Sequence, residues 1–130
     1  MNGKIKILVV DDEPDALALF RDLFTKKGYE VEIASNGMEA LELVDKVIVD
    51  VVVLYIRMPV MDRIETLAKL KQKQPDLPVV MLTAYGYDDT LINKALKRGA
   101  AGYISKNLPI AQILQTFQTL LSAVQRKKTS

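Results

Sequence analysis

Short apolar runs alternate with amphipathic segments five times along the chain, and this alternation restricts the fold more than any other feature. The runs cover residues 5–10, 29–34, 47–56, 79–82 and 102–105. Short, mostly apolar runs such as 47–56, which is rich in β-branched residues, are typical of strands buried on both faces of a sheet. Strands that alternate with helices indicate right-handed βαβ crossovers. The sequence therefore predicts one α/β domain with a doubly wound, five-stranded parallel sheet.

The segments between these runs carry helix signals. Asp12 or Asp15 is expected to cap the first helix, with Pro14 in its first turn and Gly28 at its end. Asn36 and the glycine after it turn the chain into the second helix. The last helix shows the clearest apolar stripe. That stripe consists of Ile110, Ile113, Leu114, Phe117, Leu120, Leu121 and Val124.

Length and composition exclude several classes of protein. A chain of 130 residues suits a single domain, and the absence of Cys and His removes disulfide frameworks, thiol nucleophiles and imidazole bases. The net charge of +2 is too small to indicate a nucleic-acid surface, and no apolar stretch is long enough for a secretory signal or a membrane span. We therefore expect a cytoplasmic protein without direct nucleic-acid or membrane binding.

We expect residues 1–125 to form the domain and residues 126–130 to form a basic tail that is either a solvated end or a tether.

Polar side chains follow the apolar runs at the points where ligands bind in such sheets, outside the carboxyl ends of the strands. Asp11 and Asp12 end the first strand, Thr83 ends the fourth, and Lys106 follows the fifth. Neighbouring carboxylates attract a hard cation such as Mg²⁺, while a hydroxyl and an ammonium group suit phosphoryl oxygens. Together these side chains predict a phosphate-related site.

The chain resembles the receiver domains of bacterial two-component response regulators in four segments, ILVVDDEP, LYIRMPVMD, MLTAYG and GYISK. The resemblance covers nearly the whole chain and implies a flavodoxin-like sheet with strand order 2-1-3-4-5. It also implies that Asp11 and Asp12 are the metal-binding acids, and that Arg57 contributes a backbone carbonyl to the metal. In the family, a histidine kinase phosphorylates an aspartate at the end of the third strand.

The same resemblance assigns the switch residues and the partner surface. Thr83 and Lys106 match the residues that read the phosphoryl group, and Tyr103 matches the aromatic side chain that moves inward on activation. Alternatively, Tyr103 is an edge-strand aromatic that packs on the last helix. Family members usually contact a histidine kinase, an output domain or a second copy through the last two helices and the fifth strand. Here that surface contains Ala95, Lys97, Arg98, Tyr103, Ile104 and the last helix.

Tyr55 stands where the family has its phosphate-accepting aspartate. An acyl phosphate requires a carboxylate nucleophile, whereas a phenol with a pKa near ~10 is protonated at neutral pH. The usual phosphotransfer is therefore chemically absent. We expect the ring to extend into the space of metal and phosphate, with its hydroxyl in reach of Asp11, Asp12 or Lys106.

Three further departures surround this position. Val60 and Arg63 stand where the family usually has glycine, which stiffens the loop and adds a cation. Asn107 replaces the proline that usually follows the lysine in a cis peptide. A non-proline cis bond costs about 2.5 to 4 kcal/mol, so we expect a trans bond and a different position for Lys106.

The leading interpretation is a degenerate receiver, not an enzyme, that binds a signalling partner without being phosphorylated. One alternative is a receiver switched by an anion or nucleotide in the acid pocket beside Lys106 and Arg63. Another is covalent switching at Tyr55 or Asp12. No cofactor is expected, and Mg²⁺ should bind weakly because Lys106 offsets the charge of the acid pair.

Overall fold

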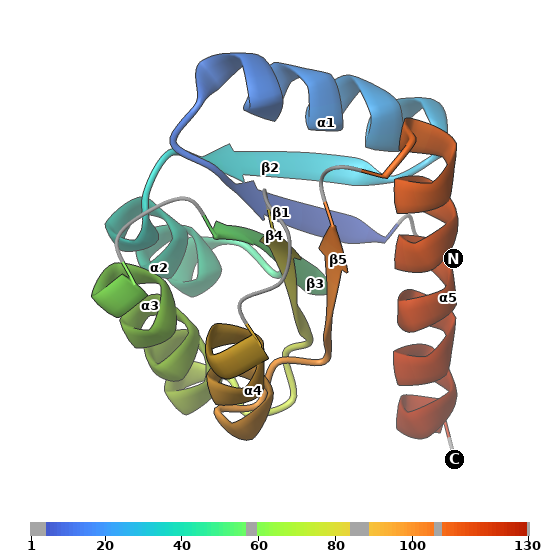
Figure 1. Ribbon diagram of the computed structural model, residues 1–130. Helices are drawn as coiled ribbons and strands as arrows, with labels where there is room; N and C mark the ends of the chain where they lie inside the picture. The colour runs from blue at the N-terminus through green and yellow to red at the C-terminus, as the bar shows by residue number, and fades with distance from the viewer. Residues whose placement is uncertain (1–4, 57–59, 84–88, 106–107, 130) are drawn as a thin grey trace.

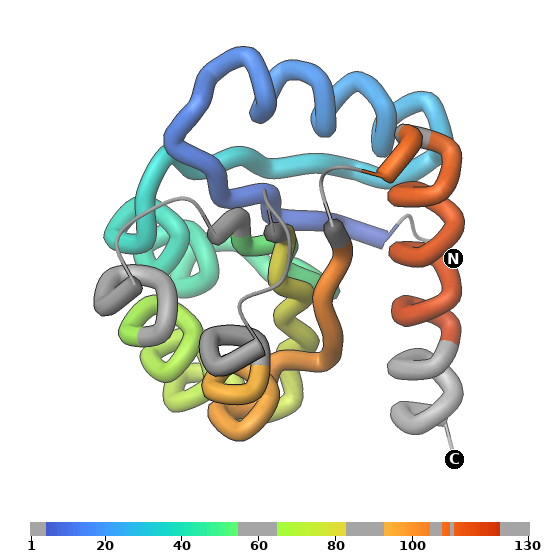
Figure 2. Tube along the Cα trace, viewed as in Figure 1, coloured from blue at the N-terminus to red at the C-terminus, as the bar shows by residue number. Residues whose placement is uncertain are grey.

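The computed structural model describes the backbone of residues 5–56, 60–83, 89–105 and 108–129. Within these ranges, some side chains are not described, and their residues are grey in Figure 2. They are the side chains of residues 55–56, 60–64, 83, 89–92, 105, 110 and 123–129. The elements in chain order are β1 Lys6–Val10, α1 Pro14–Lys26, β2 Glu30–Ala34, α2 Gly37–Lys46, β3 Val51–Ile56, α3 Val60–Lys73, β4 Val79–Thr83, α4 Asp89–Lys97, β5 Gly102–Ser105 and α5 Ile110–Thr129.

The sheet is parallel throughout, with strand order β2-β1-β3-β4-β5 (Figure 1). The register pairs Val9 of β1 with Ile33 of β2 and with Val53 of β3. Strand β3 then pairs with β4, and β4 with β5. Both the doubly wound fold and the strand order 2-1-3-4-5 are therefore confirmed.

Helices cover the sheet in two layers, each with its own apolar core. Alternate side chains of each strand point to opposite faces, so Leu8 belongs to one core and Val9 to the other. Buried side chains of α2, α3 and α4 complete the core around Leu8. Those of α1 and α5, among them Phe24 and Phe117 with ring centroids 4.9 Å apart, complete the core around Val9. The sheet is thus buried on both faces, as its apolar strands predicted.

Helix α1 begins differently from the prediction. Its N-cap is Glu13, which makes no capping hydrogen bond with its side chain, so neither Asp12 nor Asp15 caps the helix. Instead, the carboxylate of Asp11 accepts a hydrogen bond from the backbone N–H of Glu13 at 2.9 Å. Pro14 occupies the first turn as predicted, and Gly28 ends the segment with a φ of 95°, a conformation that favours glycine.

Strand β3 is shorter than its apolar run. The run 47–56 predicted one strand, but α2 continues to Lys46, and Val47 donates its N–H to the carbonyl of Leu43 as the C-cap. Ile48 is 87% exposed, and Asp50 exchanges backbone and side-chain hydrogen bonds with Lys6 before β3 starts. Apolar character alone therefore placed the start of this strand too early.

Helix α5 continues to Thr129. The backbone of the predicted basic tail is therefore largely helical, since Arg126, Lys127 and Lys128 belong to this element. The boundary of the domain at residue 125 stays a prediction.

Candidate functional site

The carboxyl ends of β1, β3, β4 and β5 lie side by side at one edge of the sheet (Figure 1). Val10, directly before Asp11, is in register with Leu54, directly before Tyr55. Ile56, directly after Tyr55, is in register with Thr83, and Thr83 is in register with Ser105. The backbones of Asp11, Tyr55 and Thr83 therefore gather at this edge, as the sequence predicted.

The two acids of the predicted pair differ in environment. Asp11 is 1% exposed, and its Oδ1 accepts the Glu13 N–H at 2.9 Å. Its own N–H donates to the carbonyl of Ala34 at 3.1 Å, which fixes the chain where it leaves β1. Asp12 is exposed. The buried carboxylate thus has a structural hydrogen bond, while its exposed neighbour is accessible to solvent ions.

The described donors at this edge are the carboxylates of Asp11 and Asp12. Among the residues that the structure describes, no group of three or more acidic, His or Cys side chains is placed to hold a metal ion. The position between the two acids and Thr83 carries a phenol, which is a poor ligand for Mg²⁺ in its protonated form.

Several predicted site residues lie outside the description. The structure does not describe Arg57, Lys106 or Asn107. The predicted trans bond between Lys106 and Asn107 therefore lies outside the described residues. For Tyr55 and Thr83 the structure gives the strand position but no side-chain direction. The same holds for Val60 and Arg63, whose backbone lies in α3.

The residues of the predicted partner surface differ in exposure, and their role in binding stays a prediction. Tyr103 on the edge strand β5 is 39% exposed, and Lys97 and Arg98 are exposed. Ala95 and Ile104, however, are 1% and 3% exposed and face the two cores, so they cannot contact a partner directly. Of the β5 residues, Ile104 and not Tyr103 packs in the core with α5.

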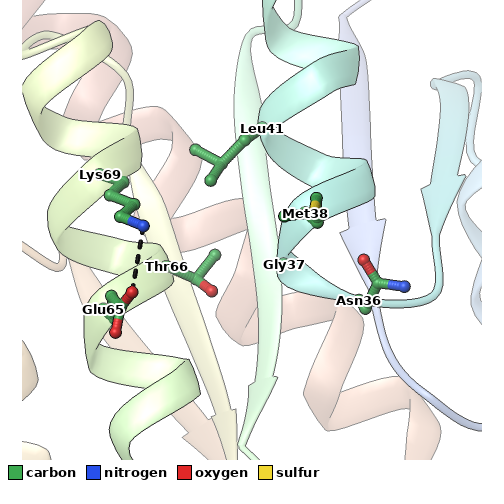
Figure 3. Close-up of a pocket in the computed structure, with 7 residues that line it drawn as sticks. All are labelled: Asn36, Gly37, Met38, Leu41, Glu65, Thr66 and Lys69. Atoms are coloured by element: carbon green, nitrogen blue, oxygen red, sulfur yellow. Dashed lines mark ion pairs between the residues drawn. The ribbon is translucent and has the colours of Figure 1, made fainter.

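A groove between α2 and α3 was not anticipated from the sequence. It has a volume of about 420 Å³ and lies between Met38 and Leu41 of α2 and Thr66 of α3 (Figure 3). Glu65 and Lys69 form an ion pair of 3.0 Å on the α3 side. Thr66 is 6% exposed, which is unusual for a polar side chain in a helix.

The N-terminus of α2 beside this groove is capped by side chains. Asn36 accepts the N–H of Glu39, and the Glu39 carboxylate accepts the Ser35 N–H and hydroxyl, each at 2.8 Å. The hydrogen bond from the Ser35 N–H, followed by that from its hydroxyl, lowers the pKa of Glu39. The sequence signal is an Asn followed three residues later by a Glu, a spacing similar to that of a capping box, although Glu39 accepts from Ser35 and not from the N-cap Asn36.

The fold and the acid-bearing edge define a flavodoxin-like α/β protein whose site lies at the carboxyl ends of the strands. The chain belongs to the response regulator receiver domain family, because the model of that family matches residues 7–118.

Relatives of similar length support this assignment. The chain is 37% identical over 108 residues to sporulation initiation phosphotransferase F of Bacillus subtilis, covering 83% of this chain and 86% of that protein. It is 33% identical to chemotaxis protein CheY of Listeria monocytogenes, covering 88% and 96%. The transcriptional regulatory protein ZraR of Klebsiella oxytoca is 40% identical over 123 residues, which are 94% of this chain but only 28% of ZraR. The chain thus spans less than a third of the length of this longer relative.

Solved structures share the fold closely. A response regulator receiver domain from Methanospirillum hungatei has a TM-score of 0.87 at 26% identity, with 96% of this chain and 99% of that one covered. NtrX from Brucella abortus in complex with ADP has a TM-score of 0.86 at 28% identity, covering 98% of this chain and 28% of NtrX.

No helix within the described residues combines the length and apolar character that a membrane span requires.

Proposed function

We propose that this receiver domain acts as a protein-interaction module whose signalling does not depend on phosphorylation at the end of β3. The residue that carries the proposal is Tyr55, the fifth residue of the six-residue strand β3. Its resemblance to the phosphate-accepting position comes from the segment LYIRMPVMD. A protonated phenol does not attack a phosphodonor to form the acyl phosphate that the family uses.

The remaining donors at this edge support the proposal. Asp11 already accepts a hydrogen bond from the backbone of Glu13, and only Asp12 of the pair is exposed. Phosphoryl transfer depends on neutralising the developing charge with positioned cations. An edge with two carboxylates and no third acid among its strand-end residues is poorly equipped to hold the required Mg²⁺.

The partner in this proposal is a signalling protein, either a histidine kinase or an output domain, that contacts α4, β5 and α5. ZraR, a transcriptional regulatory protein, supports it because this chain matches only 28% of that protein's length. The domain itself catalyses no reaction in this proposal.

Intact mass spectrometry tests the proposal directly. The protein is incubated with acetyl phosphate and Mg²⁺, with the CheY of Listeria monocytogenes treated in parallel as a comparison. We expect this protein to gain no phosphoryl group, and the variant Tyr55→Asp, treated in the same way, shows whether an acid at this position changes the result. A stoichiometric adduct that is lost in acid or base would show an acyl phosphate on another carboxylate, such as that of Asp12, and would overturn the proposal. An acid-stable adduct on Tyr55 would do the same, because switching would then be covalent.

A further inference from the structure

Met38 of α2 lies at the rim of the groove between α2 and α3. Its side chain is 73% exposed, while Leu41, one turn further along α2, is partly buried and packs against the core on this side of the sheet (Figure 3). A single exposed apolar side chain is ordinary on a protein surface. Here, however, it lies directly beside a groove of about 420 Å³, so one surface carries both an apolar projection and a hollow.

The spacing of α2 and α3 is fixed by contacts at both ends of the groove. At the start of α2, Gly37 lies so close to Thr66 of α3 that an added Cβ would collide with the hydroxyl group. At the other end, Lys73 of α3 forms an ion pair of 2.9 Å with Asp45 of α2, and the side-chain amide of Gln74 donates to a carbonyl of α2 at 3.0 Å. The groove is therefore formed before anything binds, which lowers the free-energy cost of filling it.

Charges along these two helices occur as ion pairs among the described residues. Glu65 pairs with Lys69 within α3, and Lys73 of α3 pairs with Asp45 of α2. These pairs leave no excess of either sign, so two copies can meet at this surface without net repulsion. The exposed residues Lys94, Lys97 and Arg98 of α4 would instead bring like charges together in a symmetric contact.

The order of charges along α3 is also self-complementary. Glu65 lies one turn before Lys69, and the two side chains form an ion pair of 3.0 Å beside the groove (Figure 3). A two-fold axis that crosses α3 between these residues reverses the direction of the helix in the second copy, so that Glu65 of each copy faces Lys69 of the other. The unbranched, flexible side chain of Met38 suits an irregular hollow, and the second copy offers such a hollow at the same surface.

We propose that this chain forms a symmetric dimer through α2 and α3, in which Met38 of each copy enters the groove of the other and Glu65 pairs with Lys69 across the interface. The surface is separate from α4, β5 and α5, and the inference does not depend on the chemistry of Tyr55. A contact made by two helices of each copy falls at the low end of interface areas, below about 1,200 Å², so we expect a Kd on the order of 100 µM.

Sedimentation equilibrium over a concentration range that spans this Kd tests the inference. The variant Met38→Glu should raise the Kd at least about tenfold, because it puts a charge into an apolar contact. Met38 is largely exposed in the single chain, so this change leaves the fold intact. Leu19→Glu is the matched control: Leu19 is 46% exposed on α1, which covers the opposite face of the sheet, and the Kd should stay within about twofold.

A mixing experiment tests the exchange of charges between the copies. Glu65→Lys and Lys69→Glu each place like charges opposite one another in the dimer, so each variant alone should be monomeric. An equal mixture of the two should form a heterodimer, because every Lys of one variant then faces a Glu of the other. A mixture that stays monomeric would overturn the proposed pairing, since a purely local effect of each substitution is not repaired by the other chain.

Backbone amide shifts of the unmodified protein on dilution give a readout that needs no variant. The shifted amides should lie in α2 and α3. Shifts confined to α4, β5 and α5 would overturn the inference, and so would a protein that stays monomeric well above the expected Kd. Equal losses in Met38→Glu and Leu19→Glu, or masses that grow beyond a dimer, would also contradict it, because the first excludes this surface and the second excludes a closed two-fold contact. Phosphotransfer from acetyl phosphate bears on the proposed function alone.

Discussion

The proposed function puts the phenol of Tyr55 at the position where the family has a carboxylate, and the two groups differ in charge, in nucleophilicity and in affinity for Mg²⁺. The variant Tyr55→Asp should place a third acid beside Asp11 and Asp12 and restore Mg²⁺ binding. Phosphorylation by acetyl phosphate should nevertheless stay slow, because Val60, Arg63 and Asn107 remain. Intact mass against time measures the rate. If this single change gave the full rate of a phosphorylatable receiver, the other three departures would be neutral.

The cap of α2 is a second prediction at the scale of one residue. Asn36→Ala removes the acceptor for the Glu39 N–H and should lower the free energy of unfolding by about 0.5 to 2 kcal/mol. Urea denaturation measures the change. Asn93→Ala is the matched control, since Asn93 is exposed within α4 and is not a cap, and it should change stability by less than about 0.5 kcal/mol. Equal losses in both variants would show that the capping bond does not contribute.

The sequence predicted the backbone positions of these residues better than the environment of their side chains. The spacing of Asp11, Tyr55 and Thr83 was sufficient to place their backbones at one edge, because parallel strands end together. It could not show that Asp11 is buried and bonded to the Glu13 N–H, since that depends on how the chain turns into α1. Asp12 and Asp15 were equal candidates for the N-cap of α1 because aspartate is a good capping residue. The N-cap is instead Glu13, which has an extended backbone and makes no capping hydrogen bond with its side chain.

At the scale of elements, α2 and α3 lie close together at Gly37 and Thr66. A Cβ added at Gly37 would collide with Oγ1 of Thr66, so this position at the start of α2 accepts only glycine without rearrangement. Alanine would otherwise favour the helix by up to about 1 kcal/mol, and the sign of its effect therefore reports the contact. We expect Gly37→Ala to destabilise the fold by about 1 to 3 kcal/mol, measured by urea denaturation.

A double-mutant cycle separates this contact from helix propensity. Thr66→Ala removes the obstructing hydroxyl, so Gly37→Ala should cost at least about 1 kcal/mol less in that background. Thr66→Ser retains the hydroxyl and should give little relief. Additive costs in the Thr66→Ala background would mean that the two helices do not restrict each other at this point.

Element boundaries were predictable where a backbone signal accompanied the apolar pattern. Gly28 ends the first helical segment with a φ of 95°, as the sequence predicted, and Gly99 follows α4 with a φ of 104°. The start of β3 had no such signal, because Val47 and Ile48 continue the apolar run although one caps α2 and the other is exposed. The contact of Gly37 with Thr66 was not predictable, since it joins residues far apart in the chain.

At the scale of the whole molecule, the sign of the charged residues correlates with the end of the helix at which they lie. Basic residues occupy the last turns of α1, α2, α3 and α4, and acidic residues occupy the first turns of α1 and α2. Helices in such a sheet run opposite to the strands, so their N-termini lie at the edge that carries Asp11 and Asp12. The helix dipoles therefore favour anions at that edge, and positive charge collects at the other.

A Mg²⁺ titration followed by thermal melting tests how far this edge still acts as a metal site. Binding to the native state alone adds RT ln(1 + [L]/Kd), so ~10 mM Mg²⁺ stabilises by roughly 1.8 kcal/mol if the Kd is ~0.5 mM, and by about 0.4 kcal/mol if it is ~10 mM. For a domain of this size, the first value corresponds to a rise in Tm of roughly five degrees or more and the second to about one or two. We expect a rise of no more than about two degrees at matched ionic strength, because in the proposed function the position of the third carboxylate is taken by the phenol of Tyr55. A larger rise that is specific to Mg²⁺ and abolished by Asp12→Asn would show that the acid pair binds the ion despite Tyr55.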